Sequence, residues 1–524
     1  MNNLLHDPIF GIQSKTGVRN VSLPEALALL SSGDLLAYTG QRPHQVDVWH
    51  VFTVQLAAAI LARHPEVDPQ TPPRDPDFWE KALLNLAGGQ PTAWHLVVDD
   101  VTKPAFMQHP LSSHGELEQH FKPREPKAKT PDELDVLVTA KNHDLKMTRI
   151  PDQDAEAWVY AVITYQTTSG FLGNGNYGVI RMNGGFASRP MVSLVSSLAP
   201  AARFREELKI VCDMRAQVVR ACCYKNDGIV LTWRSPWTRS GHQFNRTDLD
   251  PWFIEAARPL RLIKKNGSLI ALGATSRARQ IGPKEPDGGD VGDPWIPIQT
   301  DNKKKGRVAL SVTGRGWHAE LLCNLLFRQG CELTPLQETR MSDGPLWFVG
   351  SVLVRGQGTT EGFHHVELPI PPKAQGWLAE PSQREKLAHR AQEFLKASRE
   401  VEKALRFALI TMGEGGPANT DIKREGIAGW VSDTERAFNQ QWQVRYFPAL
   451  WALLDEDDDA ASLHWVATIR PLAERLLDAA PKRMPILAAR YYRAICRAHG
   501  AFFGKLKKSG LLADVPMPEE EVVA

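Results

Sequence analysis

The stretch SQREKLAHRAQEFLKASREVEKAL (382–405) has the pattern of an amphipathic helix. Its apolar residues recur three, four or seven positions apart, at Leu387, Ala391, Phe394, Val401 and Leu405. Ser382 and Glu385 match a capping box, which is a signature of a helix start. The stretch therefore predicts the first long helix of a C-terminal helical domain.

Three further helices are expected after it. A second capping-box pair, Ser432 with Glu435, opens one of them, and the acidic run DEDDD (455–459) separates it from the next. The apolar positions of the three helices are Phe438, Trp442 and Leu450, then Trp465, Ile469, Leu472 and Leu476, and last Ile486, Tyr491, Ile495 and Phe502. Four amphipathic helices joined by short polar loops predict a four-helix bundle, in a domain of residues 376–524.

Residues 1–375 mix helical and extended patterns instead. Helices are expected at 24–30, 46–64 and 75–87, and strands at 93–100, 267–274 and 346–356. The proline-rich residues 121–156 predict a long loop, and the polar residues 282–306 an exposed excursion. The predicted fold class is α+β, with a mixed α/β N-terminal domain (1–375) followed by the four-helix bundle.

The composition is that of an ordinary soluble protein, with 43% apolar and 23% charged residues among 524. The first residues, MNNLLHDPIF, lack the regions of a signal peptide, and no run of about 18 apolar residues predicts a membrane span. A cytoplasmic location without membrane contact is the expectation. The six cysteines contain no C-x-x-C pair, so free buried thiols are expected rather than a metal site.

A glycine-rich stretch, FLGNGNYGVIRMNGGF (171–186), contains a G-x-G-x-x-G pattern. A dinucleotide fingerprint also needs a helix after the glycines and an acidic residue about 20 positions on, whereas residues 157–205 contain no Asp or Glu. No nucleotide cofactor is therefore expected. Glycines leave the backbone without side chains, so it can lie close to a partner surface. The scattered arginines, with no carboxylates among them, favour a polyanion as that partner. An ordinary loop next to a buried strand explains the same pattern equally well.

Basic residues gather near the C-terminus. Residues 470–508 contain ten Lys or Arg against two acidic residues, and Arg490, Arg493 and Arg497 share one face of a predicted helix. Together with KKKGR (303–307), this distribution favours contact with nucleic acid or another subunit. A solvated charged face is the alternative explanation.

No familiar catalytic motif is present, since the chain lacks G-x-S-x-G and H-E-x-x-H. The adjacent His364 and His365 point to opposite sides of a strand and cannot easily bind one metal. The acidic run at 455–459 is expected to be a solvated turn. We therefore expect no enzyme activity, catalytic residue, metal or cofactor, and the alternative is a metal-dependent nuclease acting on DNA.

Several distinctive segments follow one another along the chain: MNNLLHDPIFGIQSKTGVRNVSLPEAL (1–27), PAFMQHP (104–110), SGFLGNGNYG (169–178), RMNGGFASRPMVSLV (181–195), GDPWIPI (292–298), LWFVGSVLVRGQGTTEGFHH (346–365), GWVSDTERAFNQQW (429–442) and ARYYRAICRAHGAFFGKLKK (489–508). In sequence and in order they resemble the large subunit (CasA family) of the type I-E CRISPR Cascade complex. They span nearly the whole chain in the family's order.

The resemblance implies a non-catalytic subunit at the crRNA 5′ end. Such a subunit finds the protospacer-adjacent motif (PAM) in duplex DNA and starts strand separation and R-loop formation, while the guide reads the sequence by base pairing. The implied partners are crRNA, double-stranded target DNA, the other Cascade subunits (backbone, small and 5′-handle-binding) and a recruited helicase-nuclease that cuts the DNA. A scaffold without DNA contact is a further alternative.

The resemblance also implies which residues touch the PAM. The glycine loop, with Gly170, Phe171 and Gly173, would enter the minor groove, which is only about 6 Å wide and admits bare backbone more readily than side chains. Which residue of the loop makes the contact stays open. Lys284 in IGPKEPDGG would reach into the major groove, with the lysine pair at 264–265 as competitors.

Two other implied sites lie in loops. Arg355, Gly356 and Gln357 would form a hairpin wedge that pushes into the base stack, with Gln357 at its tip. Asn142 and His143, in AKNHDLKM (140–147), would contact RNA or another subunit. The basic face at 490–497 would hold a DNA strand by charge alone.

Overall fold

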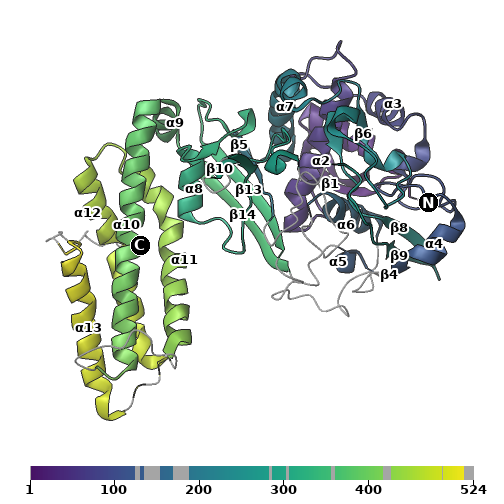
Figure 1. The fold of residues 1–524 in the computed structure, drawn as a ribbon. Helices are drawn as coiled ribbons and strands as arrows, with labels where there is room; N and C mark the ends of the chain where they lie inside the picture. The colour runs from purple at the N-terminus through teal and green to yellow at the C-terminus, as the bar shows by residue number, and fades with distance from the viewer. Residues whose placement is uncertain are drawn as a thin grey trace. The chain divides into compact units, whose positions relative to one another are not determined.

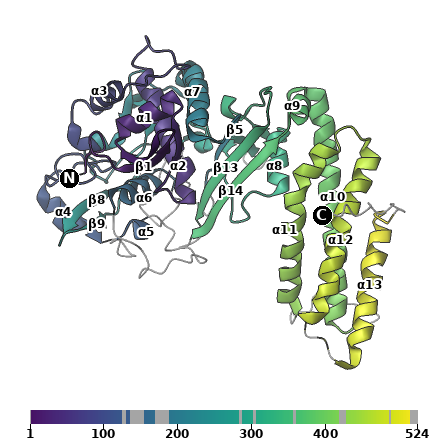
Figure 2. The ribbon, with the colours of Figure 1, turned by 180° about the vertical axis from the view of Figure 1, so that it is seen from behind.

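The computed structural model describes residues 2–123, 130–134, 154–168, 188–282, 286–301, 306–355, 360–416, 427–484, 486 and 488–512. Contacts divide the chain into two compact units. The N-terminal unit comprises Met1–Trp317 and Gly330–Ile370, and the C-terminal unit comprises His318–Gln329 and Pro371–Ala524. Figures 1 and 2 show the elements of both units from opposite sides.

Helices of the N-terminal unit begin where the sequence supplies caps and prolines. α1 (Leu23–Ser32) opens with a capping box between Ser22 and Glu25. α2 (Pro43–Leu61), α3 (Pro76–Leu86) and α7 (Pro200–Cys222) each start at a proline, whose fixed φ suits the first helical position. Further α-helices are α4 (His114–His120), α5 (Pro131–Leu134) and α6 (Ala155–Thr167).

The strands of this unit form several small sheets. One antiparallel sheet has the order β2-β1-β3, with β1 (Phe10–Ser14), β2 (Gly17–Val21) and β3 (Leu35–Tyr38). A second has the order β14-β13-β5 and joins the long hairpin of β13 (Leu346–Arg355) and β14 (Thr360–Ile370) to β5 (Met191–Val195). The remaining pairings involve β4 (Lys122–Pro123), β8 (Leu260–Lys265) and β9 (Ser268–Gly273); β10 (Ile298–Asp301), β11 (Gly306–Ala309) and β12 (Cys331–Glu332); and β6 (Ile229–Leu231) with β7 (Leu249–Ile254).

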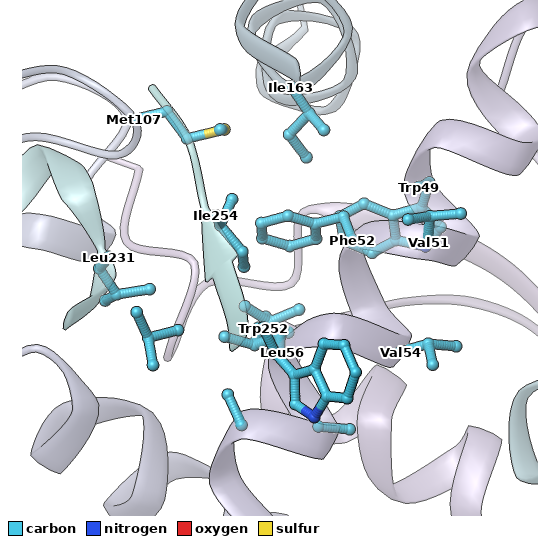
Figure 3. Close-up of a cluster of buried hydrophobic side chains, with 14 of the residues drawn as sticks. Trp49, Val51, Phe52, Val54, Leu56, Met107, Ile163, Leu231, Trp252 and Ile254 are labelled. Carbon is cyan, nitrogen blue, oxygen red and sulfur yellow. The ribbon is translucent and has the colours of Figure 1, made fainter. Parts of the chain in front are cut away.

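α2 lies in the core of the N-terminal unit. Nearly all of its residues from His44 onward are buried, whereas a surface helix buries one stripe. Figure 3 shows Trp49 and Phe52 of this helix in one cluster with Ile163 of α6. Because α2 is buried on all sides, each charged side chain that it carries needs a partner inside the protein.

α10 (Pro381–Gly413) is the central helix of the C-terminal unit. It packs against α8 (Ala319–Leu326), α9 (Pro372–Ala379), α11 (Ala428–Ala452), α12 (Asp458–Ala479) and α13 (Tyr491–Lys508). Phe394 of α10 stacks on Trp465 of α12 with ring centroids 5.3 Å apart. The Trp465 indole also donates a 2.9 Å hydrogen bond to the Phe394 carbonyl. Aromatic packing with satisfied polar atoms thus joins the first and third of the long helices.

The predicted fold class is confirmed, because a mixed α/β unit is followed by a helical one. Both predicted capping boxes in the helical unit are wrong. Glu380 caps α10 by accepting a hydrogen bond from the Ser382 amide, and Ser432 lies inside α11, which begins at Ala428. Residues 371–375, placed N-terminally by the sequence pattern, belong to the C-terminal unit together with α8.

Two predictions for the N-terminal half are also wrong. Residues 93–100 form no strand, because a 3-10 helix occupies Pro91–Trp94. The polar residues 282–306 are not simply an exposed excursion, since Trp295 and Ile296 are buried and β10 follows them. All six cysteines are free, but Cys223 and Cys496 are exposed rather than buried. Within the described ranges, no helix is both long enough and apolar enough to cross a bilayer.

Candidate nucleic-acid interface

Most of the proposed contact residues lie outside the described residues. These are Asn142, His143, Gly170, Phe171, Gly173, Lys284, Gly356 and Gln357. Arg355 ends β13, where its backbone pairs with Thr360. For the glycine segment, the Lys284 segment and the hairpin turn, the described residues that flank each of them can be located in the N-terminal unit.

The glycine segment and the hairpin leave the same sheet. β5 runs antiparallel to β13, with Met191 opposite Ser351 and Val195 opposite Trp347. The chain before Met191 and the chain after Ser351 therefore continue toward the same end of the sheet (Figure 1). Ser188, the first described residue after the glycine segment, and Arg355, the last before the hairpin turn, lie toward this end.

A close contact connects the glycine segment with the segment of Lys284. Arg189 is buried, and its guanidinium packs directly on Gly289, the last residue of the 3-10 helix Pro286–Gly289. A Cβ on Gly289 would come within 2.2 Å of an Arg189 nitrogen, and its φ of +87° also favours glycine. Described residues that flank three of the predicted DNA-contacting segments are therefore neighbours, either along one sheet or through this contact.

A buried ionic network fixes the hairpin to the helices of the N-terminal unit. Asp47 of α2 is only 2% exposed and forms an ion pair with Arg203 of α7. The same carboxylate accepts a hydrogen bond from the Ser351 hydroxyl of β13. His365 of β14 places Nδ1 2.7 Å from Ser351 Oγ and 3.4 Å from Asp47 Oδ2. One carboxylate thus contacts both strands of the hairpin and a second helix.

The network continues from Arg203 to Glu207. Arg203 Nε donates a 2.9 Å hydrogen bond to Glu207 Oε1, one turn along α7. Glu207 Oε2 accepts a 2.7 Å hydrogen bond from the Trp295 indole and lies 3.0 Å from His50 Nε2. Trp295 belongs to the segment GDPWIPI, so the network also holds the chain that follows the Lys284 region.

The charges of the network are set by mutual contact. Burial raises the pKa of the Asp47 carboxyl, but the charge of Arg203 and hydrogen bonds from His365, Ser351 and Arg203 outweigh it and hold that pKa well below its usual range. Burial likewise opposes ionisation of Glu207, while His50 and Arg203 lower its pKa below the usual range. Burial lowers the pKa of His50, and the charge of Arg203 acts in the same direction, while the Glu207 carboxylate opposes both.

The grouping of Ser351, His365 and Asp47 is not a catalytic triad. In a triad the histidine lies between the serine and the carboxylate, whereas the Ser351 hydroxyl donates directly to Asp47. Ser351 is also fully buried and out of reach of a substrate. His364 points to the other side of β14, where its ring packs on Gly316, as the alternation of strand side chains predicts. Among the residues that the structure describes, no three His, Cys, Asp or Glu side chains gather as metal ligands would.

The predicted basic face of the C-terminal unit divides into two kinds of arginine. Arg490, Arg493 and Arg497 are all exposed, with Arg490 just before α13 and the other two on it. Arg493 donates two 3.1 Å hydrogen bonds to the Gly415 carbonyl after α10, and the Arg490 side chain packs on the same glycine. The exposed side chain of Arg497 makes no hydrogen bond or ion pair with another described residue. Arg493 therefore has a structural role, and Arg497 presents its charge to solvent.

The sequence patterns missed the buried network. Its members come from five distant parts of the chain, and no motif joins them. A signal exists in α2, where Asp47 and His50 lie in a helix that is mostly apolar from Val46 to Leu61. Charged residues in such a helix indicate buried partners elsewhere.

Comparisons with known proteins bear on the fold. Neither the protein-family models nor the curated proteins gave a match to this sequence. Among solved structures, a CasA of Thermus thermophilus is similar with a TM-score of 0.63 at 15% identity, covering 97% of this chain and 99% of that one. Cse1 of Thermobifida fusca is similar with a TM-score of 0.60 at 14% identity, covering 98% and 99%. A chain of a "CRISPR RNA-guided surveillance complex" gives 0.57 at 11%, covering 96% and 99%. The protein has the fold of these CasA and Cse1 proteins over nearly its full length.

Proposed function

We propose that this chain is the large, CasA-type subunit of a type I-E Cascade complex, and that it recognises a PAM in duplex DNA and starts strand separation. The proposal rests mainly on the extent of the structural similarity, which covers both units and nearly the full length of both chains. The ordered sequence segments support it independently. If only one domain were similar, the match would cover part of the chain, and a single shared domain is compatible with many functions.

The wedge needs a rigid support. Opening a duplex at the PAM requires unstacking, which costs a few kcal/mol per base step, and a hairpin that bends under this load does not transmit it. Asp47 and Arg203 tie the strands that carry Arg355, Gly356 and Gln357 to α2 and α7. In the proposed mechanism, the buried network holds the hairpin in place while Gln357 enters the base stack.

The other two contacts act on the duplex just before the wedge. Gly170, Phe171 and Gly173 would lie along the minor groove, where backbone amides reach the acceptors that A·T and T·A pairs share. Lys284 would donate to base edges in the major groove. The proximity of Arg189 to Gly289 supports this arrangement, since it brings together chain that flanks both contacts.

Catalysis would belong to a partner. In this proposal the chain binds crRNA near Asn142 and His143, joins the other Cascade subunits in the cytoplasm, and presents the opened DNA to a helicase-nuclease. Arg497, and with it Arg490 and Arg493, would attract a DNA strand without reading its sequence.

A reconstituted complex tests the proposal. Lys284→Ala and Gln357→Ala should each weaken PAM-dependent target binding while the complex still assembles. Lys225→Ala and Gln383→Ala are matched controls at exposed positions and should bind as wild type. Binding that is unchanged in both test variants would contradict the site assignment. DNA cleavage by the purified chain with Mg²⁺ would instead support a nuclease.

A further inference from the structure

A cavity of about 170 Å³ lies in the C-terminal unit, between the first turns of α11 and the last turn of α12. Trp430 of α11 forms one wall, and Ala437, Leu476, Ala479 and Met484 give the cavity an apolar surface. Because alanine side chains are short, they leave the space beside the indole open. Pockets for drug-sized ligands occupy about 300–1,000 Å³, so this smaller cavity suits a single flat group.

Trp430 is the most exposed of the 15 tryptophans, all of which lie in the described ranges. Its exposed fraction is 45%, whereas the other tryptophans are buried or half-buried. No aromatic ring or cation of the described residues packs on its indole. An exposed indole beside an open cavity offers a flat, apolar surface on which another ring can stack.

The charge left without a partner at the cavity is positive. Arg483 lines the cavity, and its exposed side chain makes no hydrogen bond or ion pair with another described residue. Lys482 beside it is also exposed. Among the described residues, the one carboxylate on the cavity wall is Asp433, and it forms a 3.0 Å ion pair with Arg436. The surroundings of the cavity therefore suit a group that carries a negative charge, such as a phosphate.

The cavity adjoins the start of α13, where exposed arginines gather. Met484 on the cavity wall packs on Gly413 at the end of α10, where a Cβ would come within 3.1 Å of Met484 Cε. Two residues further on, Gly415 packs against the Arg490 side chain, and its carbonyl accepts from Arg493. The end of α10 thus joins the cavity to these two arginines, and a strand that they attract would pass close to the cavity.

We propose that this cavity holds one unstacked base of a single-stranded DNA, with the base on the Trp430 indole and an adjoining phosphate beside Arg483. Every base has a flat π-face, so stacking on an aromatic ring holds a strand without reading its sequence. The apolar side chains across the cavity would keep water from the stacked base. This inference rests on the proposed function, since strand separation supplies the unpaired DNA.

Fluorescence anisotropy of the full-length chain with a labelled thymidine oligonucleotide tests the proposal. An abasic strand of equal length has the same phosphates and no bases, so the difference in affinity between the two strands measures stacking. We expect wild type to bind the thymidine strand about tenfold more tightly than the abasic strand, and Trp430→Ala to lose most of this difference. Trp430→Phe keeps an aromatic ring and should retain most of it.

Two further variants separate stacking from charge. Arg483→Gln should weaken binding of both strands alike, because it removes a cation and leaves the indole in place. Phe503→Ala removes a ring that is 37% exposed in the same unit but does not line the cavity, and it should bind both strands as wild type does. Urea midpoints show whether each variant is as stable as wild type.

A crosslink in the wild-type chain tests the same contact without a variant. A strand that contains 5-bromouracil crosslinks to aromatic side chains under ultraviolet light, and mass spectrometry should find the crosslink at Trp430. Crosslinks at other residues alone, equal affinity of wild type for the two strands, or thymidine binding that Trp430→Ala leaves unchanged would overturn the proposal. Because these assays use no crRNA, PAM or other subunit, such results would leave the Cascade proposal standing.

Discussion

Replacing Asp47 with asparagine removes one charge from the buried network and keeps the shape of the side chain. Both carboxylate oxygens are in use, since Oδ1 accepts from Arg203 and Oδ2 accepts from Ser351. Asparagine has one acceptor oxygen, so one of these donors loses its partner. Breaking a buried ion pair from one side costs about 3–5 kcal/mol. Arg203 keeps Glu207, which places the expected loss in the unfolding free energy of the N-terminal unit at about 3 kcal/mol.

Urea unfolding and hydrogen exchange measure this loss. If the network holds the hairpin, exchange of peptides from β13 and β14 should speed up roughly hundredfold, since each 1.4 kcal/mol is a factor of ten. Asp455→Asn is the matched control, because its pair with Lys373 is exposed and such pairs contribute about 0–1 kcal/mol. A similarly small effect for Asp47→Asn, with unchanged exchange in the hairpin, would refute the role given to the network.

Burial raises the pKa of the Glu156 carboxyl to about 7 from an ordinary value of 4.5. As the pH rises from 4.5 to 7, the unfolded chain therefore loses this proton before the folded protein does, and the unfolding free energy falls. Glu156→Gln should therefore be more stable than wild type at pH 8 by roughly 2 kcal/mol, with little difference at pH 4, as urea midpoints would show. The hydrogen bond with Asp47 raises the pKa of His365 above its ordinary value of 6.5. The contribution of the charged His365 to the unfolding free energy is therefore complete below pH 6.5 and is lost as the pH rises through the raised pKa. NMR titration of the imidazole should show a pKa above 6.5. Arg497→Ala should lower the salt slope of DNA binding by the assembled complex by about one ion without loss of stability. Arg493→Ala should also destabilise the C-terminal unit by about 1 kcal/mol, because its hydrogen bonds to the Gly415 carbonyl disappear.

The helices were predictable where apolar residues repeat at helical spacing. Residues 382–405 lie within α10, and residues 46–61 of the helix expected at 46–64 lie within α2. Helix starts were less predictable, because a Ser-x-x-Glu pattern also occurs inside helices, as at Ser432. The burial of Trp295 was missed because the stretch 282–306 around it is mostly polar, and the hydrogen bond of its indole to the buried Glu207 forms only in the folded protein.

The candidate site was predictable in a different way. The glycine pattern around Gly173 was visible in the sequence, but the DNA contacts expected of Gly173 and Lys284 came from a family resemblance, since glycines and lysines in loops carry no periodicity. The buried network was not predictable at all, since Asp47, Arg203 and Ser351 meet only after folding. Local sequence determines helices and strands, whereas pairing of charges over more than 100 residues depends on the whole fold.

The proposed function requires this chain to open duplex DNA beside a short motif. The most direct test places 2-aminopurine in the first base pairs of a target next to a flanking motif selected from a random library, and follows its fluorescence with crRNA and the other Cascade subunits. We expect a rise in fluorescence only when this chain is present, and a much smaller rise with Gln357→Ala. Equal opening without the chain, or none with the complete complex on any selected motif, would contradict it.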